Sequence, residues 1–149
     1  MLKIAIGTDH RGFEHKNVIQ SGVNLEQKHI EWIDVGCYSS ERTDYPHFAF
    51  DVVQLMKQKK ADLGILLCGT GIGMAIAANR FEGMRAGVVW NEETAQRAKE
   101  EDNVNILTLA ADYVTPEHAI KIVIIWLNAQ FKGGRYQQRL EMIDKWNGL

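Results

Sequence analysis

The sequence predicts an α/β fold, a doubly wound (Rossmann-like) sheet of five parallel strands with helices on both faces. Five short apolar runs alternate with longer segments whose apolar residues recur at helical spacing. Strands that alternate with helices are joined by right-handed crossovers, which makes the strands parallel. Glycine and polar residues follow several of the apolar runs, at the carboxyl ends where such sheets bind ligands. The pattern therefore also predicts the edge of the sheet at which a site would lie.

The first three predicted elements cover residues 2–35. Residues 2–7 form a short apolar run that ends at Gly7-Thr8-Asp9, and residues 30–35 form a second such run. We interpret both runs as strands. Between them, residues 13–25 carry apolar side chains at roughly helical spacing, which predicts a helix.

A polar loop at residues 36–46, rich in turn residues, separates these elements from the next three. After the loop, residues 48–60 predict a helix that ends in the solvated run Lys57–Lys60. We interpret residues 61–68 as a strand, because the apolar run Leu63–Leu67 within them is typical of a buried strand, and residues 73–80 predict a short helix.

Two strands and three helices complete the predicted fold. The strands cover residues 85–90 and 104–110, and the helices cover residues 92–102, 115–131 and 135–146. Thr115-Pro116 is typical of a helix start, because threonine caps the N-terminus and proline fits the first helical position. Gly133-Gly134 breaks this helix and precedes a last amphipathic one.

Composition narrows the classes of function. The chain has 149 residues, which suits a single domain over 1–149, with 46% hydrophobic and 24% charged residues. A net charge of −2 lacks the basic excess that nucleic-acid-binding proteins carry. The apolar run at 122–127 is too short to cross a bilayer, and residues 1–7 lead straight into a strand rather than forming a leader. Two cysteines fit a reducing compartment, so we expect a cytoplasmic protein.

The most informative motif is Cys68-Gly69-Thr70-Gly71-Ile72-Gly73, between a predicted buried strand and a predicted helix. Such a turn points backbone N–H groups at an anionic oxygen, and the helix N-terminus favours a thiolate at Cys68. We interpret the motif as an oxyanion cradle with a reactive thiol at its mouth. Two alternatives stay open at this point. One is a tight turn with a small buried cysteine, and the other is a nucleotide-binding loop, although the glycine spacing matches no nucleotide fingerprint.

Two further groups of polar residues each allow two interpretations. Asp9-His10 follows the first strand, as either a turn with a helix cap or a clamp on a ligand hydroxyl or phosphate. Arg135 and Arg139 lie four residues apart on one helical face, which is either solvated or a clamp on a phosphate. Taken alone, the loop Arg42–Pro46 indicates only a turn.

Together these segments resemble the ribose-5-phosphate isomerase B family, which also includes the galactose-6-phosphate isomerase subunits. The similarity covers nearly the whole chain. It rests on five motifs in the same order: Ile6–His10, Ser39–Pro46, Cys68–Gly73, Ala77–Asn79 and Gly133–Arg139. The resemblance implies the doubly wound fold predicted above. It also implies an aldose–ketose isomerisation of a sugar phosphate through an enediolate, with no metal and no cofactor.

The resemblance assigns a role to each matching residue. Cys68 resembles the base that moves the proton, and Thr70 resembles the hydroxyl that contacts the reacting end of the sugar. The implied binding residues are Gly69, Gly71, Ile72 and Gly73 as the oxyanion cradle, Asp9, His10 and Tyr45 as sugar and phosphate contacts, and Arg135 and Arg139 as a phosphate clamp. A second subunit completes the pocket in this family. A homodimer or dimer of dimers is therefore implied, with the helix at about 135–147 packing on the partner.

The sequence departs from the family pattern at two places. Where the family carries a His-Asn-Asp run whose histidine is assigned to ring opening, this chain has Glu101-Asp102-Asn103. We expect Glu101 to take the catalytic place, and Asp102 and Asn103 to bind substrate. A phosphate-side arginine of the family aligns with Asp112, and an aspartate there would repel a phosphate. These changes favour three alternatives to ribose 5-phosphate isomerisation: another sugar phosphate of the allose or galactose 6-phosphate type, a non-catalytic sensor, or a partner subunit.

Overall fold

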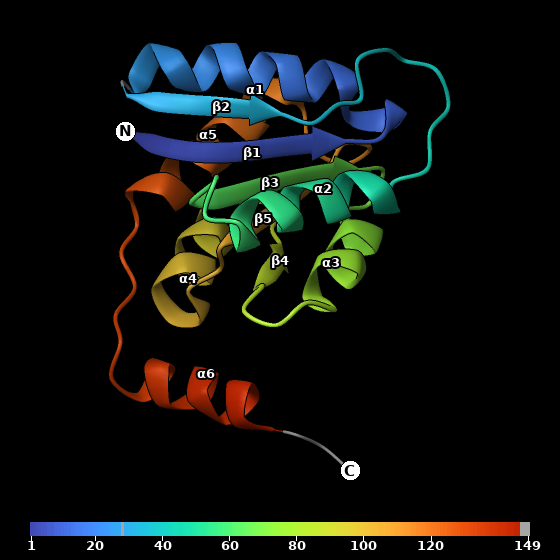
Figure 1. Cartoon of the computed structure of the whole chain (residues 1–149). Helices are drawn as coiled ribbons and strands as arrows, with labels where there is room; N and C mark the ends of the chain where they lie inside the picture. The colour runs from blue at the N-terminus through green and yellow to red at the C-terminus, as the bar shows by residue number, and fades with distance from the viewer. Residues whose placement is uncertain (28, 147–149) are drawn as a thin grey trace.

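The computed structural model, which describes residues 1–27 and 29–146, confirms the predicted five-stranded parallel α/β fold (Figure 1). The strand order is β2-β1-β3-β5-β4. The strands are β1 (Leu2–Thr8), β2 (Ile30–Asp34), β3 (Leu63–Cys68), β4 (Ala86–Val88) and β5 (Ile106–Ala110). All four strand pairs are parallel, as the alternation of strands and helices predicts.

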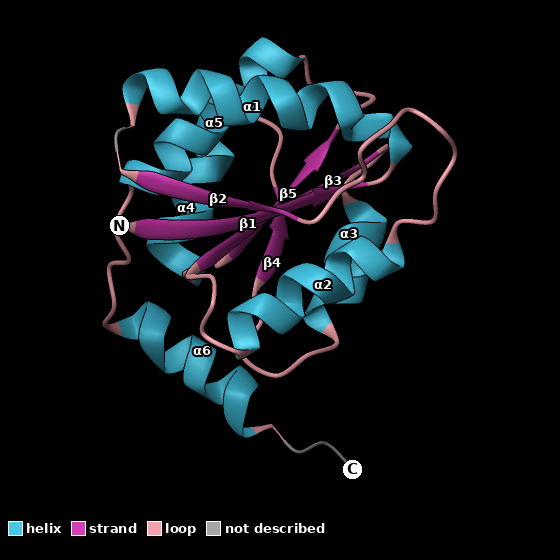
Figure 2. Ribbon diagram, turned by 45° about the horizontal axis from the view of Figure 1, so that its top comes forward, coloured by secondary structure: helices cyan, strands magenta, loops and turns pink. Residues whose placement is uncertain are grey.

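Helices cover both faces of the sheet, as Figure 2 shows. Within the described residues they are α1 (Phe13–Glu26), α2 (Pro46–Lys57), α3 (Ile72–Asn79), α4 (Glu92–Asp102), α5 (Pro116–Asn128) and α6 (Arg135–Lys145), with a short 3-10 helix at His10–Gly12. The helices α1, α4 and α5 pack on one face, and α2 and α3 pack on the other. None of these helices is both long enough and apolar enough to cross a membrane.

Side-chain alternation along the central strands builds two cores. In β3, Ile65 and Leu67 point into the core under α1 and α5, whereas Leu66 and Cys68 belong to the core under α2 and α3. Both faces are buried, which explains why the sequence of this strand is continuously apolar. The largest buried side chain, Trp126 of α5, donates its indole N–H to the carbonyl of Val104 at 3.1 Å.

Several predicted boundaries are wrong by a few residues. The strand predicted at 85–90 is only Ala86–Val88, because the backbone N–H of Trp90 bonds the Thr94 hydroxyl oxygen at the start of α4 rather than a neighbouring strand. The helix predicted from residue 48 starts at Pro46, which fits the first helical position, and the helix predicted to 131 ends at Asn128. The last helix ends at Lys145, and residue 147 of its predicted range lies outside the described residues.

The order of the strands makes a topological switch point between β1 and β3. The chain runs from β1 outward to β2 and then returns to β3 on the other side of β1. At such a switch point, the loops after the two strands turn in opposite directions and leave a crevice at the carboxyl edge. The segments after β1 and β3 are Asp9-His10 and Gly69–Gly73, which are two of the predicted site motifs.

Candidate active site

Cys68 ends β3 and lies directly under the start of α3. The side chain is 5% exposed, and its Sγ accepts the backbone N–H of Gly71 at 3.2 Å. Gly71 has φ = +74°, and a Cβ there would lie 3.1 Å from the carbonyl carbon of Leu109. A glycine is therefore required for the turn that aims this N–H at the sulfur. A backbone N–H donor and the N-terminus of α3 therefore both face the Cys68 sulfur.

The predicted cradle follows as the first turn of α3. The hydroxyl oxygen of Thr70 accepts the N–H of Ile72 at 3.2 Å, and both residues are exposed. The first turn of a helix has backbone N–H groups without partners inside the helix, and these point outward beside Cys68. Such donors can stabilise negative charge that develops on an oxygen bound here.

Tyr45, at the end of the long loop, lies against this cradle. A Cβ at Gly73 would lie 2.6 Å from Cζ of the Tyr45 ring, so the ring packs over the bare glycine backbone. The loop that carries Tyr45 is anchored by Lys16, which is 1% exposed and contacts the Asp34 carboxylate at 2.7 and 2.8 Å and the Cys37 carbonyl at 2.7 Å. Residues 16 and 34 are structural supports that the sequence motifs did not reveal.

Asp9 and His10 lie at the end of β1, on the other side of the switch point. Asp9 is buried and accepts the backbone N–H of Arg11 at 3.0 Å, which confirms the predicted cap. Burial raises the pKa of the Asp9 carboxyl group above its ordinary value. His10 donates its backbone N–H to the Thr43 hydroxyl oxygen at 3.1 Å, and its ring Nδ1 accepts the Thr43 N–H at 3.2 Å. Because Nδ1 is an acceptor, Nε2 carries the ring proton and serves as a donor.

Asp112 lies at the same edge of the sheet, after β5, and is paired with Arg11. The Arg11 Nε donates to Oδ1 of Asp112 at 3.0 Å, and Nη2 contacts Oδ2. The guanidinium holds the pKa of the Asp112 carboxyl group below its ordinary value. The predicted repulsion of a phosphate by Asp112 is therefore offset by a cation that the motif analysis missed. Its signal in the sequence was an arginine directly after Asp9-His10.

The predicted residues Glu101, Asp102 and Asn103 lie at the opposite edge of the sheet. They end α4 and precede β5, so five residues of strand, roughly 16 Å, separate them from the carboxyl edge. Asn103 has φ = +46° and closes α4 as a left-handed C-cap, with its N–H bonded to the carbonyls of Ala98 and Lys99. Glu101 pairs with Arg97 at 3.2 Å.

The arginines of α6 accompany this second group. The Lys132 N–H bonds the Glu100 carbonyl at 3.0 Å, and the Lys132 Nζ contacts the Glu100 carboxylate at 3.0 Å, which ties the start of α6 to the end of α4. Arg135 donates to the Tyr136 hydroxyl at 3.2 Å, and the guanidinium groups of Arg135 and Arg139 lie over the Tyr136 ring. The Tyr136 hydroxyl and, more weakly, the Glu101 carboxylate raise the pKa of Arg135.

One chain therefore holds two separate groups of predicted site residues. The first, the cysteine half-site, consists of Asp9, His10, Tyr45 and Cys68–Gly73 at the carboxyl edge. The second, the arginine half-site, consists of Glu101–Asn103, Arg135 and Arg139 near the amino edge. Among the described residues, no three His, Cys, Asp or Glu side chains are gathered so that they could hold a metal ion.

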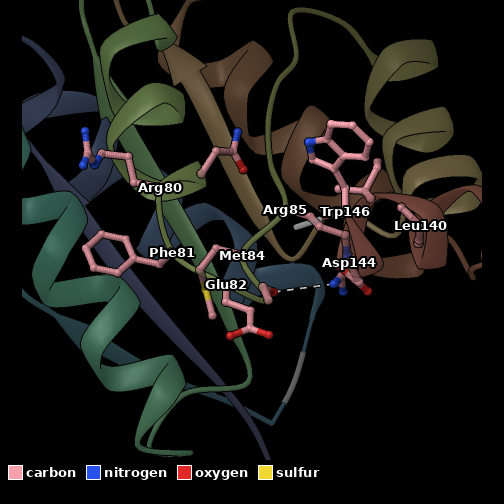
Figure 3. Close-up of a pocket in the computed structure, with 11 residues that line it drawn as sticks. Arg80, Phe81, Glu82, Met84, Arg85, Leu140, Asp144 and Trp146 are labelled. Carbon is pink, nitrogen blue, oxygen red and sulfur yellow. Dashed lines mark hydrogen bonds between the residues drawn. The ribbon is translucent and has the colours of Figure 1, made fainter. Parts of the chain in front are cut away.

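A groove of about 400 Å³ lies apart from Cys68, between the turn after α3 and helix α6 (Figure 3). Phe81 and Met84 line it from the turn, and Leu140 and Trp146 line it from the end of the chain. The groove mixes these apolar side chains with Arg80, Arg85, Glu82 and Asp144. It contains none of the predicted site residues.

Comparison with known proteins identifies the family. The family model described as Ribose/Galactose Isomerase matches residues 4–143. Ribose-5-phosphate isomerase B of Escherichia coli (strain K12) is 46% identical over 143 residues, which are 96% of this chain and 95% of that protein.

Solved structures agree over the whole fold. The ribose 5-phosphate isomerase of Thermotoga maritima superposes with a TM-score of 0.91 at 44% identity, over 97% of this chain and 98% of that one. Ribose-5-phosphate isomerase B of Mycoplasma genitalium, with bound ribulose-5-phosphate, gives a TM-score of 0.89 at 41% identity, over 97% of this chain and 95% of that one. The predicted family and reaction class are confirmed. The chain belongs to the ribose/galactose isomerase family and is an aldose–ketose isomerase of sugar phosphates.

Proposed function

We propose that this chain interconverts ribose 5-phosphate and ribulose 5-phosphate, with Cys68 as the base, in sites that two copies of the chain share. The observation that carries the proposal is the Cys68 sulfur, held at 3.2 Å from the Gly71 N–H at the start of a helix. The relatives with this activity, one of them with ribulose-5-phosphate bound, support the choice of substrate.

The proposed chemistry is a proton transfer between two neighbouring carbons. The Cys68 thiolate takes the proton from the carbon beside the aldose carbonyl, and the electron pair of that bond forms an enediolate. Backbone N–H groups of the cradle and the Thr70 hydroxyl stabilise the oxyanion. The thiol then returns the proton to the neighbouring carbon, while the hydroxyl proton of the enediolate moves from O2 to O1. The base is thereby regenerated, and nothing is oxidised or reduced overall.

A second copy of the chain would complete each site. The cysteine half-site and the arginine half-site lie at opposite edges of one sheet, so the residues of one copy cannot all reach the same ligand. A two-fold dimer can place the arginine half-site of one copy over the cysteine half-site of the other, twice by symmetry. In that arrangement Arg135 and Arg139 hold the substrate phosphate from across the interface.

Exposed apolar side chains lie where this dimer would need them. On α3, beside the cradle, Ile72 is 55% exposed and Ile76 is 64% exposed. Beyond Arg139, the side chains of Met142 and Ile143 on α6 and of Trp146 directly after it are each more exposed than these two isoleucines. Contact between these two faces would remove both from water, which favours association.

The proposal also covers the cell compartment, the extent of the domain and the role of Glu101. Both cysteines are free, which fits the cytoplasm, where phosphorylated sugars are metabolised. We treat 1–149 as one isomerase domain. Glu101, paired with Arg97, supplies a carboxylate that can accept the proton of the anomeric hydroxyl and return it to the ring oxygen as the bond between that oxygen and the anomeric carbon breaks.

The experiment is a turnover assay on four sugars: ribose 5-phosphate, allose 6-phosphate, galactose 6-phosphate and unphosphorylated ribose. We expect the wild type to turn over ribose 5-phosphate best, and Cys68→Ala to lower kcat about 10²- to 10⁴-fold, since the carbon base is gone. Cys37→Ala is the matched control, because Cys37 is equally buried but lies in the loop after β2. Full activity of Cys68→Ala would contradict the role of this cysteine. Faster turnover of a hexose phosphate would contradict the assignment of ribose 5-phosphate and identify that hexose phosphate as the substrate.

A further inference from the structure

An ion pair crosses the carboxyl edge of the sheet directly beside the cradle. Arg11 follows β1 and Asp112 follows β5, and Gly69 of the β3 loop lies between them. A Cβ at Gly69 would lie 2.9 Å from Oδ2 of Asp112 and 3.0 Å from Nε of Arg11. The Asp112 N–H also bonds the Gly69 carbonyl at 3.1 Å. The pair is therefore packed on the peptide that follows Cys68.

The pair leaves most of the arginine's donors for another partner. A guanidinium has five N–H groups, and Asp112 receives one from Nε and one from Nη2. The other three N–H groups have no hydrogen-bond partner among the residues that the structure describes, and the Arg11 side chain is 52% exposed. The next residue toward β1 is His10, whose Nε2–H is also a donor because Thr43 bonds its Nδ1. The cationic side chain of Arg11 and the N–H donor of His10 thus lie together at the end of β1.

We propose that Arg11, positioned by Asp112, binds the phosphate group of the sugar substrate in the cysteine half-site. The inference rests on the proposed function, which makes the substrate a phosphorylated sugar. A phosphate needs charged donors, and the planar guanidinium fork suits its oxygens. Asp112 holds two of the five donors in place, so less side-chain freedom is lost when the ligand binds. Arg11 would touch the ligand, and Asp112 would act through Arg11 as a positioning residue.

Asp112 therefore has a different role from the one that the sequence predicts. Its carboxylate does not face the phosphate as an isolated charge but orients the Arg11 guanidinium, which binds the phosphate. The phosphate would then lie on the Gly69 side of the cradle, while the reacting carbon lies at Cys68.

The first test removes the charge of Arg11. For Arg11→Gln we expect KM for ribose 5-phosphate to rise roughly 10- to 100-fold with little change in kcat, because a charge-assisted contact to the bound substrate is lost. The dissociation constant of inorganic phosphate, measured by calorimetry, should rise by a similar factor. Lys121→Gln, an exposed residue of α5, is the control for the loss of one positive charge. Unchanged phosphate affinity in Arg11→Gln would overturn the proposal.

Two further variants separate binding from a structural role. Arg11→Lys keeps a point charge without the fork, so its phosphate affinity should fall between those of the wild type and Arg11→Gln. The double variant Arg11→Gln with Asp112→Asn keeps a hydrogen-bonded bridge over Gly69 without charge. If Arg11 served only as a structural bridge, this amide pair would restore the phosphate affinity. If Arg11 binds the phosphate, the amide pair cannot replace it and the affinity stays low. Recovery of phosphate affinity in the double variant would overturn the proposal, and so would equal weakness of Arg11→Lys and Arg11→Gln.

Calorimetry with inorganic phosphate does not depend on turnover, so the two proposals fail separately. If the wild type binds phosphate through Arg11 but does not isomerise ribose 5-phosphate, only the substrate assignment fails. If Cys68→Ala abolishes turnover while Arg11→Gln binds phosphate like the wild type, only the role of Arg11 fails.

Discussion

At the scale of single residues, the backbone conformations and buried groups around Cys68 are ones that lower the stability of the fold. Gly71 adopts a left-handed conformation so that its N–H can reach the Cys68 sulfur, and Gly73 is bare so that Tyr45 can pack on it. Asp9, on the opposite side of the crevice, is a buried carboxyl group whose only described local donor is the Arg11 N–H. These features hold the half-site in shape before substrate arrives.

Because the pKa of Asp9 is raised in the folded protein, we expect the free energy of unfolding to depend on pH. Folded Asp9 keeps its proton to a higher pH than unfolded Asp9, whose pKa is near 3.8. The stability contribution of Asp9 is therefore full below pH 3.8 and decreases as the pH rises through the higher folded pKa. Asp9→Asn keeps the cap but does not titrate. Urea unfolding from pH 4 to 7 should show wild-type stability falling relative to Asp9→Asn. Parallel curves, or a difference of the opposite sign, would contradict this reading.

The sequence predicts individual residues well where the chemistry is local. The strand–glycine–helix pattern around Cys68 is contained in a few consecutive residues, so the cradle could be recognised from it. The pair between Arg11 and Asp112 could not, because its members are 101 residues apart and meet only when β1 and β5 lie in one sheet. The charges of Arg11 and Asp112 are both visible in the sequence, but their pairing is not.

At the scale of elements, the switch point depends on how the long loop after β2 is anchored. Lys16 of α1 is buried with Asp34 and the Cys37 carbonyl, and it lies 4.9 Å from the centre of the Tyr38 ring. This anchor fixes the first part of the loop, and the two hydrogen bonds between Thr43 and His10 fix the second part. Tyr45 follows two residues after Thr43, so α1 contributes to the position of a side chain that packs on the cradle.

Removal of this anchor should cost stability and substrate affinity together. Lys16→Met leaves the Asp34 carboxylate without its buried partner, which we expect to lower the free energy of unfolding by about 3 kcal/mol. The loosened loop should raise KM for the sugar phosphate. Urea unfolding and steady-state kinetics measure the two effects. Lys57→Met, at an exposed position of α2, is the control. A variant as stable as the wild type would show that the pair does not anchor the loop.

Element types follow from periodicity, and element ends follow from side chains elsewhere in the fold. The five apolar runs become the five strands, of which the central three are largely buried and the edge strands β2 and β4 are half-buried. The end of β4 is closely followed by the N-cap of α4, where the Thr94 hydroxyl oxygen accepts the Trp90 N–H. Such a side-chain bond does not alter the hydrophobic pattern, so the predicted strand is too long.

At the scale of the whole molecule, the topology separates residues that the resemblance assigns to one pocket. Glu101 and Arg135 lie near the amino edge of the sheet, and Cys68 lies at the carboxyl edge. Helix α6 extends from the body beside α4, with Leu140 as its buried residue (Figure 1). The separation is a consequence of strand direction and could not be read from motif spacing. The resemblance predicted the second subunit, and the geometry supplies the physical reason to propose it.

The shared site is tested most directly by mixing two inactive variants, Cys68→Ala and Arg135→Ala. Each homodimer carries two defective sites. In a mixed dimer, the intact Cys68 of one copy meets the intact Arg135 of the other, so one of its two sites is native. After unfolding and refolding together in equal amounts, we predict recovery of about a quarter of the wild-type activity, since half of the dimers are mixed. Recovery of no more activity than the two variants show separately would contradict a site built from two copies.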